Sequence, residues 1–382
     1  MRLYIHWPFC LSRCAYCDFN SRVAGRRVME GYREALLKEI DAWSHLIGEE
    51  GRVLESLYLG GGTPSTMGGG EVAGMIEEVG RGFALQPGAE VTVEVNPATW
   101  SCEDYAAARD GGVNRFSVGV QSLDDGVLRL LTRAHDAGEA REAACHALRT
   151  GGTVSVDLLY ALPAGGLESL LRTVDEVLTW RPHHLSVYAL ALEERAPLAR
   201  RLRAGDISLP GEDEAADQFL EVLERLRAAG YRQYEISNFC LPGYHSRHNL
   251  AYWRREEYLG IGAGAHSLLG KCRFSNLVPV LGYMKRIRKG LLPVERCEIL
   301  DAGEELEEEI MLGLRTSDGI PEGLLRNSVG YLEDLESMGL LLKRGGRVLL
   351  TPEGMLLSNA VIVGLLTQAK PVLDCQSPYW VR

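Results

Sequence analysis

Residues 2–19 read RLYIHWPFCLSRCAYCDF, and this stretch decides how the rest of the chain is interpreted. Residues 2–7 are rich in β-forming side chains and a proline ends the run, so we predict a strand followed by a loop. The loop carries Cys10, Cys14 and Cys17. A structural zinc site would add a fourth ligand or a second cysteine pair nearby, and neither is evident. Three thiolates on a four-iron, four-sulfur cluster leave one iron open to another molecule, and we favour this over a degenerate zinc site or chance clustering.

Beyond this loop, short apolar segments alternate with helical stretches. The expected strands are 2–7, 53–59, 91–95, 115–120, 154–159 and 184–188. The expected helices are 29–46, 71–82, 102–110, 138–149 and 167–180. This alternation predicts βαβ units and a parallel sheet, hence an α/β fold and a partial or full (β/α) barrel. Polar and glycine residues gather where strands end, at the rim that carries the chemistry of such folds.

The pattern changes twice towards the C-terminus. We predict a barrel core over 1–230, an irregular segment rich in aromatic and His residues over 231–295, and a helical domain over 296–382. The last domain reads as a helix over 331–338, strands over 340–343 and 348–351, and a final helix from about 352. Helices followed by a two-stranded wing resemble a winged-helix module. Its acidic lead-in opposes DNA binding, so we expect a packing or partner-docking role.

Composition narrows the function classes. Of 382 residues, 46% are hydrophobic and 24% charged, as in ordinary globular proteins. The 41 Lys and Arg against 52 Asp and Glu give a net charge of −11, which argues against nucleic acid as a partner. No apolar run approaches the roughly 18 residues of a spanning helix, and the start lacks a secretion signal. We therefore expect a cytoplasmic protein that is not integral to a membrane.

The cysteine motif, with Tyr16 before its last Cys, resembles the radical S-adenosylmethionine superfamily. The run 4–10 and the triplet 17–19 narrow the resemblance to the branch of oxygen-independent coproporphyrinogen III oxidase, and within it to the shorter HemW-type heme chaperones. The resemblance implies a radical-SAM barrel and a [4Fe-4S] cluster on Cys10, Cys14 and Cys17. It also implies S-adenosylmethionine on the open iron, whose reductive cleavage yields a 5′-deoxyadenosyl radical.

The same resemblance implies the cofactor-binding residues. In the family, the glycine motif matched by Gly60–Pro64 holds the methionyl amino group, a carboxylate such as Glu94 can bind ribose, and Arg133 can pair with the cofactor carboxylate. Taken alone, the first would more commonly be a tight loop and the second an exposed or paired strand-end charge. The implied set is Tyr4, Tyr16, Phe19, Gly61, Gly62, Thr63, Glu94, Gln121, Arg133, Asp157 and Ala191.

A second distinctive segment reads His-Asn-x-x-Tyr-Trp over 248–253, followed by a glycine-rich run over 260–267. The first pattern distinguishes HemW-like proteins, to which heme binding is ascribed. Imidazole is a strong axial ligand for heme iron, and aromatic neighbours offer an apolar wall. The alternative is a capping or core-satisfied histidine with aromatic packing. The glycine run lacks the spacing of a dinucleotide fingerprint. The heme-binding candidates are His248, Asn249, Tyr252, Trp253 and His266, with His248 as the expected iron ligand and His266 as the fallback.

Two function classes remain open. The first is a heme chaperone that passes heme to acceptor apo-haemoproteins, such as respiratory ones at the membrane. The second is a radical enzyme acting on a porphyrin, either a coproporphyrinogen III decarboxylating dehydrogenase or a methyltransferase. Phe19 stands where the oxidase subgroup has Cys, and only nine residues precede Cys10, so we expect no counterpart of the oxidase's enclosing extension. Both features favour the chaperone, and we expect no oxidase activity. We expect a monomer or a dimer.

The remaining cysteines are each isolated in sequence, and we expect them to be small buried hydrophobes. Two of them, Cys240 and Cys272, lie nearest the aromatic segment in sequence and are the alternatives considered for heme contact. The full set is Cys102, Cys145, Cys240, Cys272, Cys297 and Cys375.

Overall fold

The computed structural model describes residues 1–369 and divides into two compact units. The first unit comprises Met1–Gln233, Ser237–Tyr252 and Glu256–Ile299. The second comprises the short pieces Tyr234–Ile236 and Trp253–Arg255 together with residues 300–369. Within residues 1–369, no helix is long and apolar enough to cross a membrane.

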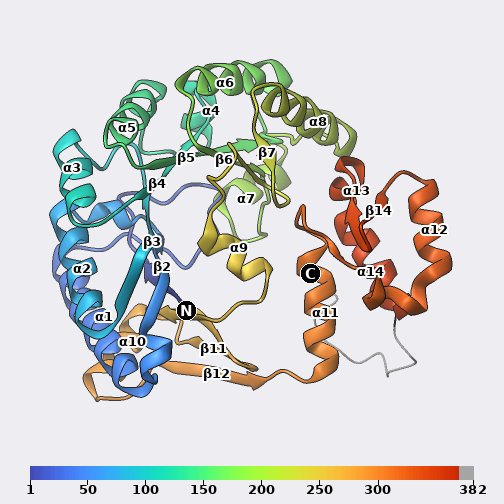
Figure 1. The fold of residues 1–382 in the computed structure, drawn as a ribbon. Helices are drawn as coiled ribbons and strands as arrows, with labels where there is room; N and C mark the ends of the chain where they lie inside the picture. The colour runs from blue at the N-terminus through green and yellow to red at the C-terminus, as the bar shows by residue number, and fades with distance from the viewer. Residues whose placement is uncertain (370–382) are drawn as a thin grey trace. The chain divides into compact units, whose positions relative to one another are not determined.

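The first unit is built on one mixed sheet of twelve strands (Figure 1). Its strands β1 to β6 pair in parallel and are Arg2–Trp7, Val53–Gly61, Ala84–Val95, Arg115–Gln121, Thr153–Tyr160 and His184–Ala189. Short strands extend both ends of this array: β7 (Arg232–Gln233), β8 (Asn238–Cys240), β9 (Tyr258–Ile261), β10 (His266–Leu269), β11 (Cys272–Asn276) and β12 (Val294–Ile299). The order β12-β11-β10-β9-β1-β2-β3-β4-β5-β6-β8-β7 leaves β12 and β7 as edges. The predicted α/β fold is confirmed, as a partial barrel.

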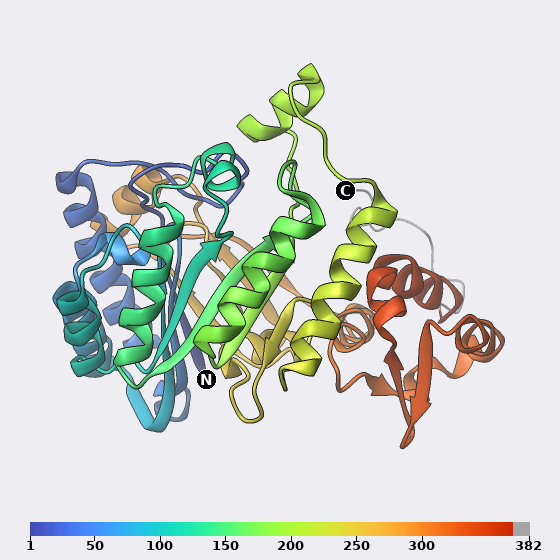
Figure 2. The same cartoon turned by 90° about the horizontal axis from the view of Figure 1, so that it is seen from above.

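Helices cover the outer face of the curved sheet (Figures 1 and 2). They are α1 (Arg26–Leu46), α2 (Gly69–Gly82), α3 (Cys102–Asp110), α5 (Ala137–Arg149), α6 (Gly166–Trp180), α8 (Glu212–Ala228) and α10 (Val280–Arg288). The short helices α4 (Asp125–Leu130) and α7 (Pro197–Ala204) lie instead at the carboxyl ends of the strands, and α7 projects from them in Figure 2. The predicted helices between 29 and 180 are present to within three residues. The sequence analysis named no helix between 190 and 230, where α7 and α8 lie. The helix α9 (Arg247–Trp253) instead lies on the inner side of the sheet (Figure 1).

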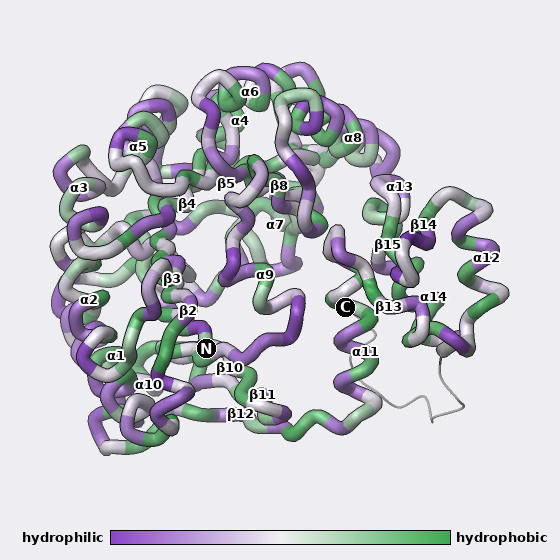
Figure 3. The backbone as a smooth tube through the Cα atoms, viewed as in Figure 1, coloured by the Kyte–Doolittle hydropathy of each residue, from purple (hydrophilic) through white to green (hydrophobic). Residues whose placement is uncertain are grey.

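Side-chain alternation along the strands explains this arrangement. In β1, Leu3, Ile5 and Trp7 are fully or almost fully buried towards the helices, while Tyr4 and His6 point to the barrel interior. Parallel strands with helices on one face and an enclosed interior on the other become nearly continuous buried runs. Figure 3 accordingly shows hydrophobic colour along the central strands and mixed colour along the helices.

The second unit has its own hydrophobic core, which includes Ile310, Leu335, Val348 and Leu365. Its elements are α11 (Ala302–Gly313), β13 (Ile320–Pro321), α12 (Val329–Ser337), β14 (Leu341–Arg344), β15 (Arg347–Leu350), α13 (Pro352–Leu356) and α14 (Ser358–Ala369). The strands form a small sheet in the order β13-β15-β14. The helix, wing and final helix expected after residue 330 are therefore present.

Two expectations from the sequence need correction, one about the segment after residue 230 and one about the isolated cysteines. The stretch read as irregular contains the strands β8 to β11, of which β9 pairs in parallel with β1 and in antiparallel fashion with β10. Each strand is only three to five residues long and therefore too short for a clear sequence period. The isolated cysteines are also not uniformly buried. Cys102, Cys145 and Cys297 are exposed, because their helix or strand positions face outward. Cys240 is buried and Cys272 half-buried, while Cys375 lies outside the described residues.

Candidate functional site

A cavity of about 400 Å³ opens at the carboxyl ends of the parallel strands. This volume lies in the range of small-molecule sites. Every cofactor-binding residue named from the sequence lines it except Tyr4, together with the three cysteines of the motif. The predicted residues on its wall are Cys10, Cys14, Cys17, Tyr16, Phe19, Gly61, Gly62, Thr63, Glu94, Gln121, Arg133, Asp157 and Ala191.

The loop that carries the three cysteines is held by backbone bonds at both ends. Cys10 N donates to Arg22 O at 3.1 Å, and Ala15 N donates to Leu131 O at 3.0 Å. Ala15 also packs in a small apolar cluster with Leu131 and Leu198. These contacts fix the thiols at the mouth of the cavity before any metal binds.

The thiol arrangement bears on which metal group fits. Within residues 1–369, no three His, Cys, Asp or Glu side chains lie close enough together to share one metal ion. The three thiols are free and line one opening, which suits a cluster of several irons better than a single zinc. Burial raises the pKa of Cys10 and of Cys17, so iron would have to displace their protons on binding.

The glycine motif at the end of β2 lies against the cysteine loop. Gly62 N donates to Trp7 O at 2.8 Å, and Thr63 N donates to Phe9 O at 2.8 Å. A Cβ on Gly62 would come within 3.0 Å of the backbone of residues 8 and 9. Gly61 has φ +115°, in the region that favours glycine. A side chain at either position would therefore push the cysteine loop away.

Glu94 lies on the wall of the cavity with both carboxylate oxygens bonded. Tyr58 Oη donates to its Oε1 at 2.8 Å, and Gly61 N donates to its Oε2 at 3.0 Å. Burial and, as a smaller effect, the nearby carboxylate of Asp157 raise the pKa of Glu94 to about 7 against these hydrogen bonds. Glu94 can therefore gain or lose a proton near neutral pH.

Arg133 connects the cavity wall to the cysteine loop. Its Nη1 donates to Cys14 Sγ at 3.3 Å and its Nη2 donates to Gly119 O at 2.7 Å, while Nε is buried with no partner among the described residues. The preceding residue Thr132 has φ +57°, and Gln121 at the end of β4 has φ +68°. Non-glycine residues adopt this conformation rarely, and such strain concentrates at functional sites.

The cavity also has polar residues that the sequence analysis missed. A Ser-Val pair recurs on β4, β5 and β6, and its serines Ser117, Ser155 and Ser186 line the interior. Ser117 Oγ donates to Asp157 Oδ2 at 2.9 Å, and burial raises the pKa of Asp157 against these bonds. The repeat of the same pair at equivalent strand positions was a usable signal for these residues.

Deeper in the cavity, Arg115 and Thr92 face each other across β4 and β3 in register. Arg115 Nη1 donates to Tyr244 O at 3.1 Å. Arg115 Nη2 and Thr92 Oγ1 are buried and have no partner among residues 1–369. Two such polar atoms side by side can receive an acceptor group of a bound molecule or ordered water.

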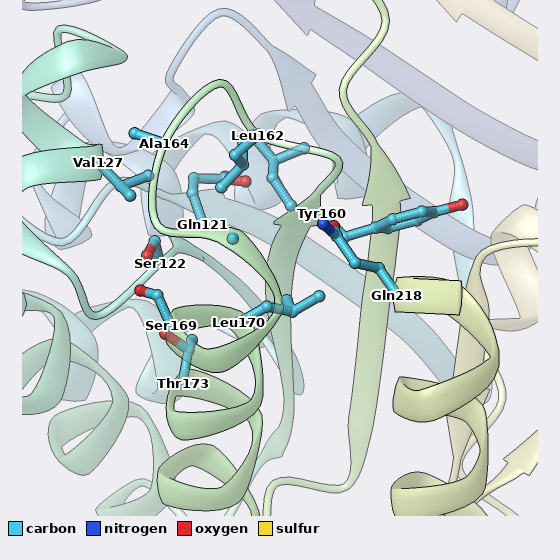
Figure 4. A pocket seen from close by; sticks show the side chains of 12 residues that line it. Gln121, Ser122, Val127, Tyr160, Leu162, Ala164, Ser169, Leu170, Thr173 and Gln218 are labelled. Carbon is cyan, nitrogen blue, oxygen red and sulfur yellow. The ribbon is translucent and has the colours of Figure 1, made fainter. Parts of the chain in front are cut away.

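A second pocket lies behind Gln121, at the ends of β4 and β5 beside α6 (Figure 4). Its volume is about 10 Å³. That is close to the roughly 10–15 Å³ needed by one water molecule, so it is too small for a cofactor. Gln218 Oε1 accepts a hydrogen bond from Ala161 N at 2.8 Å in its wall.

Tyr4 lies beneath the cavity rather than on its wall. Its hydroxyl is 3.0 Å from His6 Nδ1, and its ring lies 6.1 Å from that of Tyr58. His6 Nε2 in turn lies 3.0 Å from Asn20 O in the cysteine loop. Tyr4 therefore supports the site from below in this structure.

The structure does not gather the five heme candidates into one pocket. His248 is 1% exposed, with Nδ1 2.8 Å from Ser56 Oγ and Nε2 2.8 Å from Tyr252 Oη. Burial lowers the pKa of His248 to about 3, so the ring is neutral. As an axial ligand His248 would first have to break both bonds. This arrangement is the core-satisfied alternative considered from the sequence.

The other heme candidates have different surroundings. Asn249 lines the main cavity, and Trp253, at the end of α9, belongs to the second unit. His266, at the start of β10, is exposed. It is therefore the candidate whose imidazole is reachable by a large ligand in this structure.

The glycine-rich run 260–267 supports the cysteine loop from the other side. Asn20 Nδ2 donates to Ala263 O at 2.9 Å. Gly262 has φ +107°, and a Cβ there would come within 2.7 Å of His6 O. Gly262 N also donates to Glu39 Oε2 at 2.8 Å, inside the core beneath α1. These glycines therefore serve close packing behind the cysteine loop.

Comparison with known proteins gives a consistent result. The family model of the radical SAM superfamily matches residues 4–177, and that of the HemN C-terminal domain matches residues 300–357. The chain is 38% identical over 372 residues to the heme chaperone HemW of Mycobacterium tuberculosis, covering 95% of this chain and 94% of that protein. It is 32% identical over 377 residues to the heme chaperone HemW of Bacillus subtilis, covering 95% and 98%.

A solved structure, the coproporphyrinogen III oxidase HemN of Escherichia coli, superposes with a TM-score of 0.82. It covers 97% of this chain and 90% of that chain at 24% identity. At this identity the likeness supports the fold alone.

Proposed function

The chain belongs to the radical S-adenosylmethionine superfamily, in the branch of the HemW-type heme chaperones, and from that premise we propose that it binds heme and transfers it to acceptor proteins. It would do so while carrying a [4Fe-4S] cluster and an S-adenosylmethionine site. The observation that carries the proposal is the near-complete match, over 95% of the chain, to relatives of that name.

The cluster would be held by Cys10, Cys14 and Cys17, whose free thiols line the cavity mouth. When bound, it would leave one iron open for the cofactor and supply an electron for cleavage of its sulfonium. Arg133 sits beside Cys14 with an unpartnered Nε, which supports a role in holding the cofactor carboxylate. The glycine motif would bring its backbone close to the methionyl amino group.

Glu94 would accept hydrogen bonds from the ribose hydroxyls, and for this its carboxyl group must be ionised. Its two oxygens already accept hydrogen bonds from Tyr58 and Gly61, so these donors must be shared or replaced when ribose binds. Gln121, Asp157 and Ala191 would complete the walls around the nucleoside, with Tyr16 and Phe19 closing the side of the cysteine loop. Tyr4 would act through His6 and the loop rather than by direct contact.

For heme, we propose His266 as the iron ligand, because its imidazole is exposed whereas both nitrogens of His248 are engaged. Asn249, Tyr252 and Trp253 would contribute through the position of α9. Acceptors would be apo-haemoproteins, including respiratory ones at the membrane, reached from the cytoplasm by a monomer or dimer of this chain. Nucleic acid is not expected as a partner at a net charge of −11.

The second candidate is a radical enzyme acting on a porphyrin. The observation that favours this enzyme is that the cavity extends below the proposed cofactor residues to Arg115 and Thr92. Arg115 Nη2 and Thr92 Oγ1 are buried there without a hydrogen-bond partner among the described residues, so they could bind a polar group of a substrate. A substrate there would lie beside the radical source.

One experiment separates the two functions. The reconstituted protein is incubated anaerobically with heme and, separately, with coproporphyrinogen III, S-adenosylmethionine and a reductant. The chaperone function predicts a stable Soret band, transfer of that heme to an apo-haemoprotein, and no carbon dioxide. Carbon dioxide release that depends on S-adenosylmethionine, without stable heme uptake, would replace it with the enzyme.

A further inference from the structure

Two cysteines outside the cavity lie in contact on adjacent strands. Cys272 begins β11 and Cys297 is on β12, and their sulfur atoms are 3.2 Å apart. In the antiparallel register, Cys297 is opposite Phe274, and Cys272 is opposite Ile299. Because residues two apart on a strand share a face, both thiols project from the same side of the sheet.

Solvent reaches this pair. β12 is an edge strand, Cys297 is exposed and Cys272 is half-buried. Phe274, which lies opposite Cys297 and two residues from Cys272, packs its ring on Trp43 of α1 at a centroid distance of 5.3 Å. This aromatic pair lies on the same face of the sheet as the two thiols, and Cys297 on the edge strand leaves them accessible to solvent. A small disulfide can therefore approach them.

We propose that Cys272 and Cys297 form a reversible intramolecular disulfide, which makes this edge of the sheet a thiol-redox site. The oxidant is a small disulfide of the glutathione class. The Cys297 thiolate attacks one sulfur of the oxidant, forming a mixed disulfide and releasing one thiol. Cys272 then gives up its proton to the thiolate released in the first step, and its sulfur attacks Cys297 Sγ and releases the second thiol. Two protein thiols are oxidised and one disulfide is reduced to two thiols, so atoms and electrons balance.

The chemistry of the pair agrees with this order. The hydrogen bond between the two sulfur atoms, with Cys297 as partner, raises the pKa of Cys272. Cys272 is thereby held as the protonated resolving thiol, and the more exposed Cys297 is the one that meets the oxidant first. Exposed disulfides of this kind are the labile ones that respond to the thiol pool.

The segment closed by the disulfide supports the cysteine loop. It contains Asn276, whose Nδ2 donates to Glu39 Oε1 at 2.7 Å, and Val278, whose carbonyl accepts from Asn20 Nδ2 at 3.2 Å. Tyr283 Oη in the same segment donates to Glu39 Oε2 at 2.6 Å. Oxidation would therefore restrain the chain that packs behind the proposed cluster ligands without involving any of them.

The test uses the full chain with its cluster, equilibrated anaerobically over a series of oxidised-to-reduced glutathione ratios and then blocked with an alkylating reagent. Trypsin cuts after Lys271, Arg273, Arg296 and Arg315, so the disulfide would join the dipeptide 272–273 to the peptide 297–315. We expect this linked pair to grow from a minor to the major form as the ratio rises, and to vanish on adding dithiothreitol.

Matched variants make the result specific. Cys272→Ser and Cys297→Ser should each abolish the linked pair, whereas Cys145→Ser, at another exposed cysteine, should leave it unchanged. Amide exchange in β12 should slow in the oxidised wild type and not in Cys272→Ser. The proposal is overturned if the linked pair is absent at every ratio, if Cys297 stays as the mixed disulfide with glutathione, or if the only cross-links join two chains.

Discussion

The cavity rim and helix α9 are both built from polar and aromatic residues that stand out in the sequence, yet the fold uses them differently. The rim residues come from loops and strand ends far apart in the chain, from Cys10 to Ala191, and they meet around one cavity. The α9 residues are neighbours in sequence, and the structure distributes them over a buried hydrogen-bond chain, the cavity wall and the second unit.

The difference has a topological cause. In a parallel sheet, all strands deliver their carboxyl ends to the same edge, so residues in that position converge whatever lies between them. The seven residues of α9 do not converge in this way, because successive side chains project from different faces of a helix. His248 points to β2 and Asn249 to the cavity. Sequence proximity is thus weaker evidence for a shared site than equivalent strand position.

The largest effect is expected when a thiol is removed from the cavity rim, and this tests whether the rim residues act together as one site. Replacing any one of Cys10, Cys14 and Cys17 by Ala should abolish cluster assembly, because three ligands already leave one iron without protein support. Anaerobic reconstitution followed by iron and sulfide analysis measures the effect. Cys145→Ala, an exposed cysteine on α5, is the matched control and should keep full iron content. Full occupancy by zinc without iron would contradict the rim as a cluster site.

Arg133 tests whether the rim binds the cofactor as a unit. Losing a buried charge-assisted contact should weaken S-adenosylmethionine binding by about 2–5 kcal/mol, so Arg133→Ala should raise the dissociation constant at least tenfold. Titration calorimetry on the reconstituted protein checks it. Arg129→Ala, an exposed arginine on α4, should leave affinity unchanged. An unaltered affinity in Arg133→Ala with intact cluster would remove this residue from the site.

These two regions also show which features of the fold and of the candidate site could be predicted from the sequence. Strand and helix order up to residue 190 follows from hydrophobic periodicity, and the rim follows from strand order. The support beneath the rim could not be predicted, because it depends on long-range pairs such as Glu39 with Asn276. The same holds for the contact between Cys272 and Cys297, which arises only from the register of β11 and β12.

Glu39 shows how the support behind the rim can be probed by pH. Burial raises its pKa from 4.5 to about 7, so the folded protein binds more protons than the unfolded chain between these values. The contribution of Glu39 to the free energy of unfolding should therefore fall by about 3 kcal/mol as pH rises from about 4.5 to about 7. Denaturant unfolding at a series of pH values measures this.

In Glu39→Gln this falling contribution should be lost, so the stability of the variant relative to the wild type should rise with pH over that window. Glu94, whose pKa is also raised, adds a falling contribution in both proteins, and His248, whose pKa is lowered, adds a rising one. Replacement at Glu34, a carboxylate on the same helix for which no such network exists among the described contacts, is the matched control and should keep the wild-type slope. An equal slope in Glu39→Gln and wild type would show that Glu39 does not titrate between the folded and unfolded states in this range.

The smallest expected effect concerns the two histidines in and after α9, and its measurement identifies which of them binds the heme iron. His266→Ala should lower heme affinity about tenfold or more, which corresponds to about 1.4 kcal/mol, because it removes an exposed imidazole. His248→Ala should instead lower the free energy of unfolding by about 1–3 kcal/mol, since it leaves the buried hydroxyls of Ser56 and Tyr252 without their partner. Soret titration and denaturant unfolding, run on both variants, separate the two effects. A tenfold loss of heme affinity in His248→Ala with unchanged His266→Ala would mean that α9 opens on binding, and that the buried histidine, not the exposed one, is the ligand.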